Sequence, residues 1–342
     1  MTTDCIDLSE VLDSGSSWAH SGLVVTAEGE LIGFHAGQLV AFDDRGAVRR
    51  VLRLGLTEGH GITLVLDGDD ENLWISDPGF VFGSTPEAGD EAWEPLFGKG
   101  IRLDNCQPRV VKITLEGDIL VELPLPPRDP AVSGMMGEYC PCSVAVDEER
   151  FGGSGDVWVA DGYGSSFVHR FDKDGQHLAV LSGEEGGGRF LCPHAVFIDR
   201  RGQKDPELYI ADRENRRVQV YDLDGHYLRT VGASFLNSPS GFAQWGELLV
   251  VAELYSRLAL LDMEDNLIDY LGADEASRKG QGWPNRPGWP NTLTADGRAG
   301  VADLHHADHL NSPHSVAVDA DRNLYVSEWL LGGRYTKFAL RD

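Results

Sequence analysis

The sequence lacks the features that would place the protein at a membrane or on nucleic acid. It has no apolar run near the roughly 18 residues needed to cross a bilayer, and its first residues lack the basic end and apolar stretch of a signal peptide. Its 29 basic residues are outnumbered by 55 acidic ones, and the net charge of -26 repels phosphate backbones and anionic lipid heads. We therefore expect a cytoplasmic protein that binds no nucleic acid and no membrane.

Cysteine is also scarce. The chain has five cysteines in 342 residues, an odd number, which argues against a disulfide framework and for reduced thiols. Cys140 and Cys142 are one residue too close for the Cys-x-x-Cys spacing that is common in zinc and redox sites, and no second pair accompanies them. We interpret both as small core residues.

Amphipathic helical stretches are missing as well, and a repeat takes their place. Six units, spaced about 40 to 60 residues apart, each hold three or four short runs of β-branched and aromatic residues bounded by turns such as Asp-Gly. The clearest copy runs from Phe190 to Asp222. This pattern predicts an all-β chain, with residues 1–342 forming a single six-bladed β-propeller domain. A sandwich or a solenoid fits the length of the unit less well.

Two insertions interrupt the repeat. Residues 78–108 lie inside the second unit, and residues 272–310 lie between the fifth and the sixth. The second insertion holds Trp283 and Trp289 in a run rich in glycine and proline, which cannot form regular ladders because proline lacks an N–H donor. Long irregular insertions in a compact fold are commonly binding loops. We expect both to lie as loops over the mouth of the channel, with the two tryptophans in contact with a substrate.

A set of histidines occupies one position of the repeat. The first strand of each propeller blade lines the central channel, so equivalent positions at its start form a ring around the axis. Aligning the six units gives that ring as His20, His60, Cys142, His194, Ser240 and His314. His60, His194 and His314 belong to alternate blades, about 120° apart in a six-fold ring. Zinc takes three imidazole nitrogens and keeps a fourth position open, so we predict that these three bind zinc or another divalent transition metal.

Three further residues complete the predicted site. His20 occupies the ring position without fitting the alternation, and we expect it beside the metal, in contact with substrate. Tyr163 and Arg213 follow the second strands of blades three and four, at the channel mouth. A phenol there can transfer a proton and a guanidinium can anchor a carboxylate. Aspartates that end second strands are expected to bond turn backbone instead: Asp77, Asp161 and Asp212.

The motifs around these residues resemble a known family. They are Val157-Trp-Val-Ala-Asp-Gly-Tyr163-Gly, Cys192-Pro-His194 and Ala211-Asp-Arg213-Glu-Asn, and they are similar to those of peptidyl-α-hydroxyglycine α-amidating lyase, a six-bladed propeller of the NHL-repeat group. The resemblance implies zinc on three histidines that match His60, His194 and His314. It also implies that Tyr163 assists deprotonation of a substrate hydroxyl and that Arg213 belongs to the active site.

At two positions the sequence departs from that family. The family has a blade-one arginine in a His-Arg-Gly context, where this chain has Ala36. The family's structural calcium site uses an aspartate directly after the third histidine, where this chain has Ser315, so the sequence argues against calcium. The metal ligands and the tyrosine are retained while one substrate-side cation is lost. We therefore expect a changed substrate specificity.

Our leading interpretation is a metal-dependent lyase or hydrolase that acts on a small hydroxylated or carbonyl substrate. Cleavage of a carbinolamine C–N bond is one option within this class. Two alternatives stay open. Copper or iron on the same three histidines would support redox chemistry, since imidazole suits these ions, and a non-catalytic propeller would serve as a binding platform for proteins or ligands.

Overall fold

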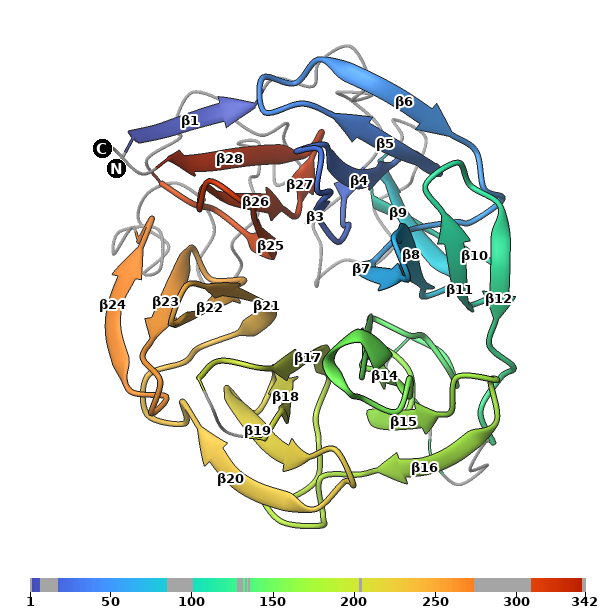
Figure 1. Cartoon of the computed structure of the whole chain (residues 1–342), viewed down its shortest axis with the longest axis vertical. Helices are drawn as coiled ribbons and strands as arrows, with labels where there is room; N and C mark the ends of the chain where they lie inside the picture. The colour runs from blue at the N-terminus through green and yellow to red at the C-terminus, as the bar shows by residue number, and fades with distance from the viewer. Residues whose placement is uncertain are drawn as a thin grey trace.

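The computed structural model describes residues 2–6, 18–84, 101–127, 132, 134, 136–202, 205–273 and 309–339. Within them the chain forms six four-stranded antiparallel sheets around a central axis, which confirms the predicted six-bladed β-propeller (Figure 1). The helical structure among these residues is one 3-10 turn, η1 (Glu149–Phe151). No helix in this part of the chain is long and apolar enough to cross a membrane.

The first five blades take their strands in chain order, from the axis outward (Figure 1). Blade one has β3 (Val24–Val25), β4 (Leu31–His35), β5 (Gln38–Phe42) and β6 (Val48–Leu52). Blade two has β7 (Gly61–Asp67), β8 (Asp70–Asp77), β11 (Arg109–Thr114) and β12 (Ile119–Glu122). Blade three has β13 (Ser143–Val146), β14 (Val157–Asp161), β15 (Phe167–Phe171) and β16 (His177–Leu181). Blade four has β17 (Pro193–Asp199), β18 (Glu207–Asp212), β19 (Arg217–Asp222) and β20 (Tyr227–Val231). Blade five has β21 (Pro239–Trp245), β22 (Leu248–Glu253), β23 (Arg257–Leu261) and β24 (Leu267–Leu271).

Blade six closes the ring by combining both ends of the described chain. Its inner strands are β25 (Pro313–Val318), β26 (Leu324–Glu328) and β28 (Arg334–Ala339), and its outer strand is the N-terminal β1 (Thr2–Ile6). A second pairing joins β2 (Trp18–Ala19) to β27 (Leu330–Leu331). The repeat alignment did not assign β1, and it placed Ala19 of β2 at the start of blade one. Together they tie the first blade to the last.

The position of each strand in its blade matches its sequence pattern. Every residue of the second strands β4, β14 and β26 is buried, because these strands are covered on both faces by neighbouring blades. The outer strand β16 alternates between half-buried and exposed residues, as expected where one face meets solvent. The apolar core is therefore a set of clusters between blades, and the first strands line the axis.

The first insertion differs from our expectation. We expected residues 78–108 to be a loop, but β9 (Phe80–Ser84) and β10 (Ile101–Asn105) pair as an antiparallel hairpin. The apolar and β-branched residues of these short runs favour strand pairing. Residues 85–100 lie outside the described part of the chain. So do residues 274–308, which include Trp283 and Trp289, and the place of these loops over the channel stays a prediction.

Candidate functional site

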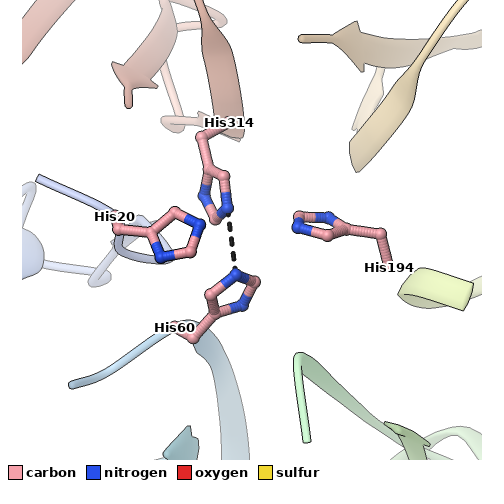
Figure 2. A group of neighbouring side chains, drawn as sticks. All are labelled: His20, His60, His194 and His314. Atoms are coloured by element: carbon pink, nitrogen blue, oxygen red, sulfur yellow. Dashed lines mark hydrogen bonds between the residues drawn. The ribbon is translucent and has the colours of Figure 1, made fainter. Parts of the chain in front are cut away.

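Four histidines from blades one, two, four and six point toward one another on the axis (Figure 2). His20, His60, His194 and His314 each offer one ring nitrogen, and these atoms all lie within 4.8 Å of one another. Each side chain is at most 3% exposed. The three histidines predicted from alternate blades are thus brought together, and His20 joins them.

Three of these histidines are held in the same way by the next blade around the ring. His60 Nδ1 lies 2.6 Å from the backbone oxygen of Cys142, and His194 Nδ1 lies 2.8 Å from that of Ser240. His314 Nδ1 lies 3.3 Å from the backbone oxygen of Ser21. A carbonyl oxygen only accepts, so Nδ1 is the donor and Nε2 presents its lone pair toward the axis.

The contact between His60 and His314 shows that the cluster suits a cation. Their Nε2 atoms lie 3.1 Å apart (Figure 2), while each Nδ1 faces a backbone carbonyl oxygen. Three contacts therefore need a proton each, but two neutral imidazoles carry only two. Burial lowers the pKa of both rings well below its ordinary value, which disfavours an extra proton. A divalent transition metal would replace the missing proton, and neutral imidazole nitrogen is a preferred ligand for it.

Tyr163 places its hydroxyl against the same nitrogens. Its Oη lies 3.0 Å from His194 Nε2, 3.1 Å from His20 Nε2 and 3.3 Å from His60 Nε2. Arg213 Nη1 donates to this oxygen at 3.3 Å. Burial raises the pKa of Tyr163 well above its ordinary value, and the charge of Arg213 opposes that rise. The two residues predicted at the channel mouth are therefore one hydrogen-bonded pair next to the histidines.

Acidic side chains at the ends of the second strands position the ring. Each accepts a backbone N–H from the segment that leads into the first strand of its own blade, two or three residues before the ring position. The pairs are Asp77 with Thr57, Asp161 with Cys140, Asp212 with Leu191, Glu253 with Asn237 and Glu328 with Asn311. The expectation that the aspartates bond turn backbone holds for Asp77 with Gly79 and for Asp161 with Ser165, and the bonds to the segment before the first strand were not expected. These repeated hydrogen bonds thereby hold the backbone that leads into His60, His194 and His314.

Glycines allow the site residues to approach the neighbouring blades. A Cβ at Gly61 would lie 2.6 Å from the backbone oxygen of Cys142, which accepts from His60. A Cβ at Gly162, next to Tyr163, would lie 2.4 Å from the backbone oxygen of Pro193. Both distances are far inside van der Waals contact. The sequences Gly-His-Gly and Gly-Tyr-Gly are therefore requirements of close packing around the axis.

The two sides of the cluster differ in character. On one side Tyr163 belongs to an apolar cluster that includes Phe80, Leu254 and Trp329, which we call the roof. On the other side a cavity of about 310 Å³, walled by the first strands, reaches His60, His194 and His314 but is not lined by Tyr163. The roof also contains Cys140 and Cys142, which confirms their interpretation as core residues.

Sequence reasoning missed Glu58. Its Oε1 lies 3.1 Å from Nδ1 of His20, and the residue is 4% exposed. A signal was present in the alignment, because Glu58 stands two residues before its ring histidine, where blades three to six carry small residues. Those residues are Cys140, Cys192, Ser238 and Ser312. A buried acid at a position of small residues marks a special environment.

Sequence comparisons agree with the resemblance seen in the motifs. No model of a protein family matches the chain. It is similar to human NHL repeat-containing protein 3, with 27% identity over 233 residues that cover 66% of this chain and 58% of that protein. It is also similar to a probable peptidyl-alpha-hydroxyglycine alpha-amidating lyase of Caenorhabditis elegans, with 26% identity over 216 residues that cover 59% of this chain and 55% of that protein. The chain thus spans little more than half the length of these relatives.

Solved structures resemble the propeller as a whole. A streptogramin B lyase superposes with a TM-score of 0.56 at 14% identity, covering 98% of this chain and 97% of that one. Virginiamycin B lyase from Staphylococcus aureus superposes with a TM-score of 0.54 at 12% identity, covering 99% of both chains. At such low identity the likeness shows the shared fold alone.

Proposed function

We propose that this propeller is a metal-dependent lyase that acts on a small hydroxylated substrate in its central channel. The observation that carries the proposal is the meeting of His60 Nε2 and His314 Nε2 at 3.1 Å, with the hydroxyl of Tyr163 beside them. Similarity to a relative named as a probable α-amidating lyase supports the reaction class. We propose zinc as the metal, because a set of neutral imidazoles suits it.

His60, His194 and His314 are the residues that would hold the ion. When bound, it would supply Lewis acidity, which lowers the pKa of a hydroxyl group near it. Their Nδ1–H groups donate to backbone carbonyls, and these contacts keep the three Nε2 atoms directed at the axis. The protein's own contribution is thus a rigid, buried set of donors.

Tyr163 is the group that we propose moves the proton. For a carbinolamine, the hydroxyl loses its proton, the C–O bond becomes a carbonyl, and the C–N bond breaks as the nitrogen gains a proton. Tyr163 Oη is within hydrogen-bond distance of three ring nitrogens, so it reaches the atoms around which this exchange takes place. Arg213 donates to that oxygen, and its charge favours the deprotonated phenol. One residue can therefore accept the hydroxyl proton and return it to nitrogen.

The surroundings favour a substrate with an apolar group. The roof places Phe80, Leu254 and Trp329 on the side of Tyr163. Ala36 stands where the resembling family has an arginine, so this side offers one cation fewer to an anionic substrate. We propose that Trp283 and Trp289 add to the apolar cover, and that the substrate is a small molecule met in the cytoplasm.

The buried histidines also bear on the alternative of a non-catalytic platform. A propeller that only displays its outer faces to partners gains nothing from four imidazoles buried on its axis. Polar groups buried without enough protons lower stability, and proteins retain such arrangements where function requires them. We therefore favour the enzyme over the platform.

The proposal is tested by metal analysis and a substrate panel. Protein purified without chelators is analysed for bound metals by mass spectrometry and then incubated with α-hydroxyglycine peptides and other carbinolamides, with products followed by NMR. We expect about one equivalent of transition metal and release of an amide and an aldehyde or keto acid. Tyr163→Phe should keep the metal and lose about 100- to 10,000-fold in rate, and His194→Ala should lose the metal. Metal-loaded protein that cleaves no carbinolamide would overturn the proposal.

A further inference from the structure

We propose that His20 is a fourth imidazole donor to the same metal and that Glu58 is the carboxylate that orients it. This inference rests on the proposed metal site and changes its composition, because the centre becomes a four-histidine site in which a substrate oxygen would bind as a fifth ligand rather than at an open fourth position. It replaces the expectation that His20 contacts substrate. Glu58 acts through His20 and is a positioning residue.

The first argument is the place of His20 among the other rings (Figure 2). Its ring centroid lies 4.4 Å from that of His60 and 4.6 Å from that of His314, and the centroids of His60 and His314 are themselves 4.6 Å apart. Its Nε2 lies 3.1 Å from Tyr163 Oη, the same atom that His194 Nε2 approaches at 3.0 Å. His20 therefore directs its Nε2 at the same small volume as the other three.

The second argument is that His20 is fixed and covered. It directly follows β2, whose Ala19 pairs with Leu330 of β27. The ring of Trp329 lies 5.0 Å from the imidazole ring at a tilt of 36°, and only 2% of His20 is exposed. His20 is also not among the residues that line the 310 Å³ cavity. A rigid, covered side chain suits a metal ligand, which must keep one geometry.

The third argument concerns Glu58, because the group next to Nδ1 of His20 differs from that next to Nδ1 of the other histidines. Where the other three Nδ1 atoms hydrogen-bond to backbone carbonyls, Nδ1 of His20 lies 3.1 Å from a carboxylate oxygen, which is an ion-pair distance without hydrogen-bond geometry. Carboxylates in this position hold the tautomer and raise the basicity of metal-binding histidines. Within the described residues, the second oxygen of Glu58 is buried without a hydrogen-bond partner. Such an acid is costly unless it serves a nearby positive charge.

The fourth argument is the charge balance of the site. Four neutral imidazoles bring no negative charge to a divalent cation, and Arg213 adds a positive charge through Tyr163. Glu58, at 4% exposure, is the acid that contacts a histidine of the cluster. An all-nitrogen donor set with one carboxylate behind it selects zinc or copper over magnesium or manganese.

The test counts imidazole ligands with a spectroscopic metal. Chelator-treated full-length protein is reloaded with one equivalent of Cu²⁺, and pulsed EPR counts the coordinated imidazoles, while competition with a chromophoric chelator measures zinc affinity. We expect four imidazoles in the wild type, three in His20→Ala, and at least about a tenfold loss of zinc affinity in that variant. Glu58→Gln should keep four imidazoles and bind zinc about 10- to 100-fold more weakly.

The matched control is His35→Gln. His35 is another buried histidine of blade one, but its Nε2 contacts the hydroxyl of Tyr335 at 2.7 Å, away from the cluster. This variant should keep the wild-type count and affinity. If His20→Ala does not fold, as judged by circular dichroism, the count in the wild type decides alone.

The outcomes separate this inference from the proposed function. A wild type with three imidazoles, or a His20→Ala variant with unchanged count and zinc affinity, overturns the four-histidine centre and leaves the lyase proposal standing. A wild type that binds neither metal overturns both. Four imidazoles with normal metal binding but no cleavage of any carbinolamide would support this centre and contradict the lyase.

Discussion

His60 Nε2 and His314 Nε2 lie 3.1 Å apart, although 254 residues separate the two histidines in the chain. Blades two and six bring them together, and each ring is already held through Nδ1 by a backbone carbonyl. Two neutral rings have too few protons for these contacts. If the proposed metal occupies this site, metal binding and folding stability are therefore linked.

The first prediction concerns His314→Leu, which removes one of the two opposed nitrogens. In the presence of a chelator we expect its unfolding free energy to stay within about 1 kcal/mol of the wild type, because the lost hydrogen bond to Ser21 is offset by relief of the repulsion. With zinc at about 100 times its dissociation constant, the wild type should gain about 2.7 kcal/mol and the variant almost nothing. Urea unfolding under both conditions measures this. A variant that responds to zinc like the wild type would contradict the assignment.

The second prediction concerns Asp212, which holds the segment before His194. Its carboxylate accepts from the N–H of Leu191 at 2.8 Å and from Arg217 Nε at 2.7 Å. Asp212→Ala removes the acceptor of the Leu191 N–H and breaks the ion pair with Arg217, so we expect a loss of about 3 to 5 kcal/mol in unfolding free energy, together with weaker metal binding. The control is Asp222, the half-buried last residue of β19. Asp222→Ala should leave zinc affinity unchanged, and equal losses of affinity in both variants would refute a positioning role.

The predictable part of the structure is the part that repeats. The unit from Phe190 to Asp222 has the same strand order and end-of-strand acid as its neighbours, so aligning the units placed equivalent residues on one ring. The strand Thr2–Ile6 escaped prediction for a physical reason. It is a single short segment whose partner, Arg334–Ala339, lies at the other end of the described chain, and local pattern carries no signal of so distant a pairing.

The sequence predicted where the site residues lie on the ring, but it did not predict the direction of their side chains. The sequence argument chose His60, His194 and His314 because they belong to alternate blades. It used only the position of each residue on the ring. His20 sits one blade away, yet its side chain turns inward because β2 and Glu58 hold it there. The direction of an imidazole depends on such tertiary contacts, which a repeat alignment does not contain.

The third prediction separates two roles for Arg213. The sequence suggested a carboxylate anchor, whereas Nη1 of this residue donates to Tyr163 Oη at 3.3 Å. If Arg213 acts on Tyr163, Arg213→Met should lower kcat/KM about 10- to 100-fold, the value of one hydrogen bond to a charged group, for substrates with and without a carboxylate alike. Paired assays of a peptide acid and its amide measure this. A loss confined to the acid would favour the anchor.

The last prediction concerns pH and a histidine far from the cluster. His169 is 3% exposed in blade three, and its Nδ1 lies 3.2 Å from His177 Nε2. Burial, and then the charge of His177, lowers the pKa of His169 from 6.5 to about 3. The unfolded chain therefore binds a proton below pH 6.5 that the folded protein refuses, so stability falls as the pH drops from 6.5 toward 3. His169→Phe removes this contribution.

The measurement is urea unfolding of the wild type and of His169→Phe at a series of pH values, with a chelator present throughout. Between pH 7.5 and 5.5 the wild type should lose about 1.4 kcal/mol more than the variant. His226→Gln is a control of opposite sign, because Asp222 raises the pKa of His226 and the folded protein binds its proton more tightly. The stability that His226 contributes is present below the unfolded pKa and is lost as the pH rises. Parallel pH curves for the wild type and His169→Phe would show that His169 is readily protonated in the folded protein.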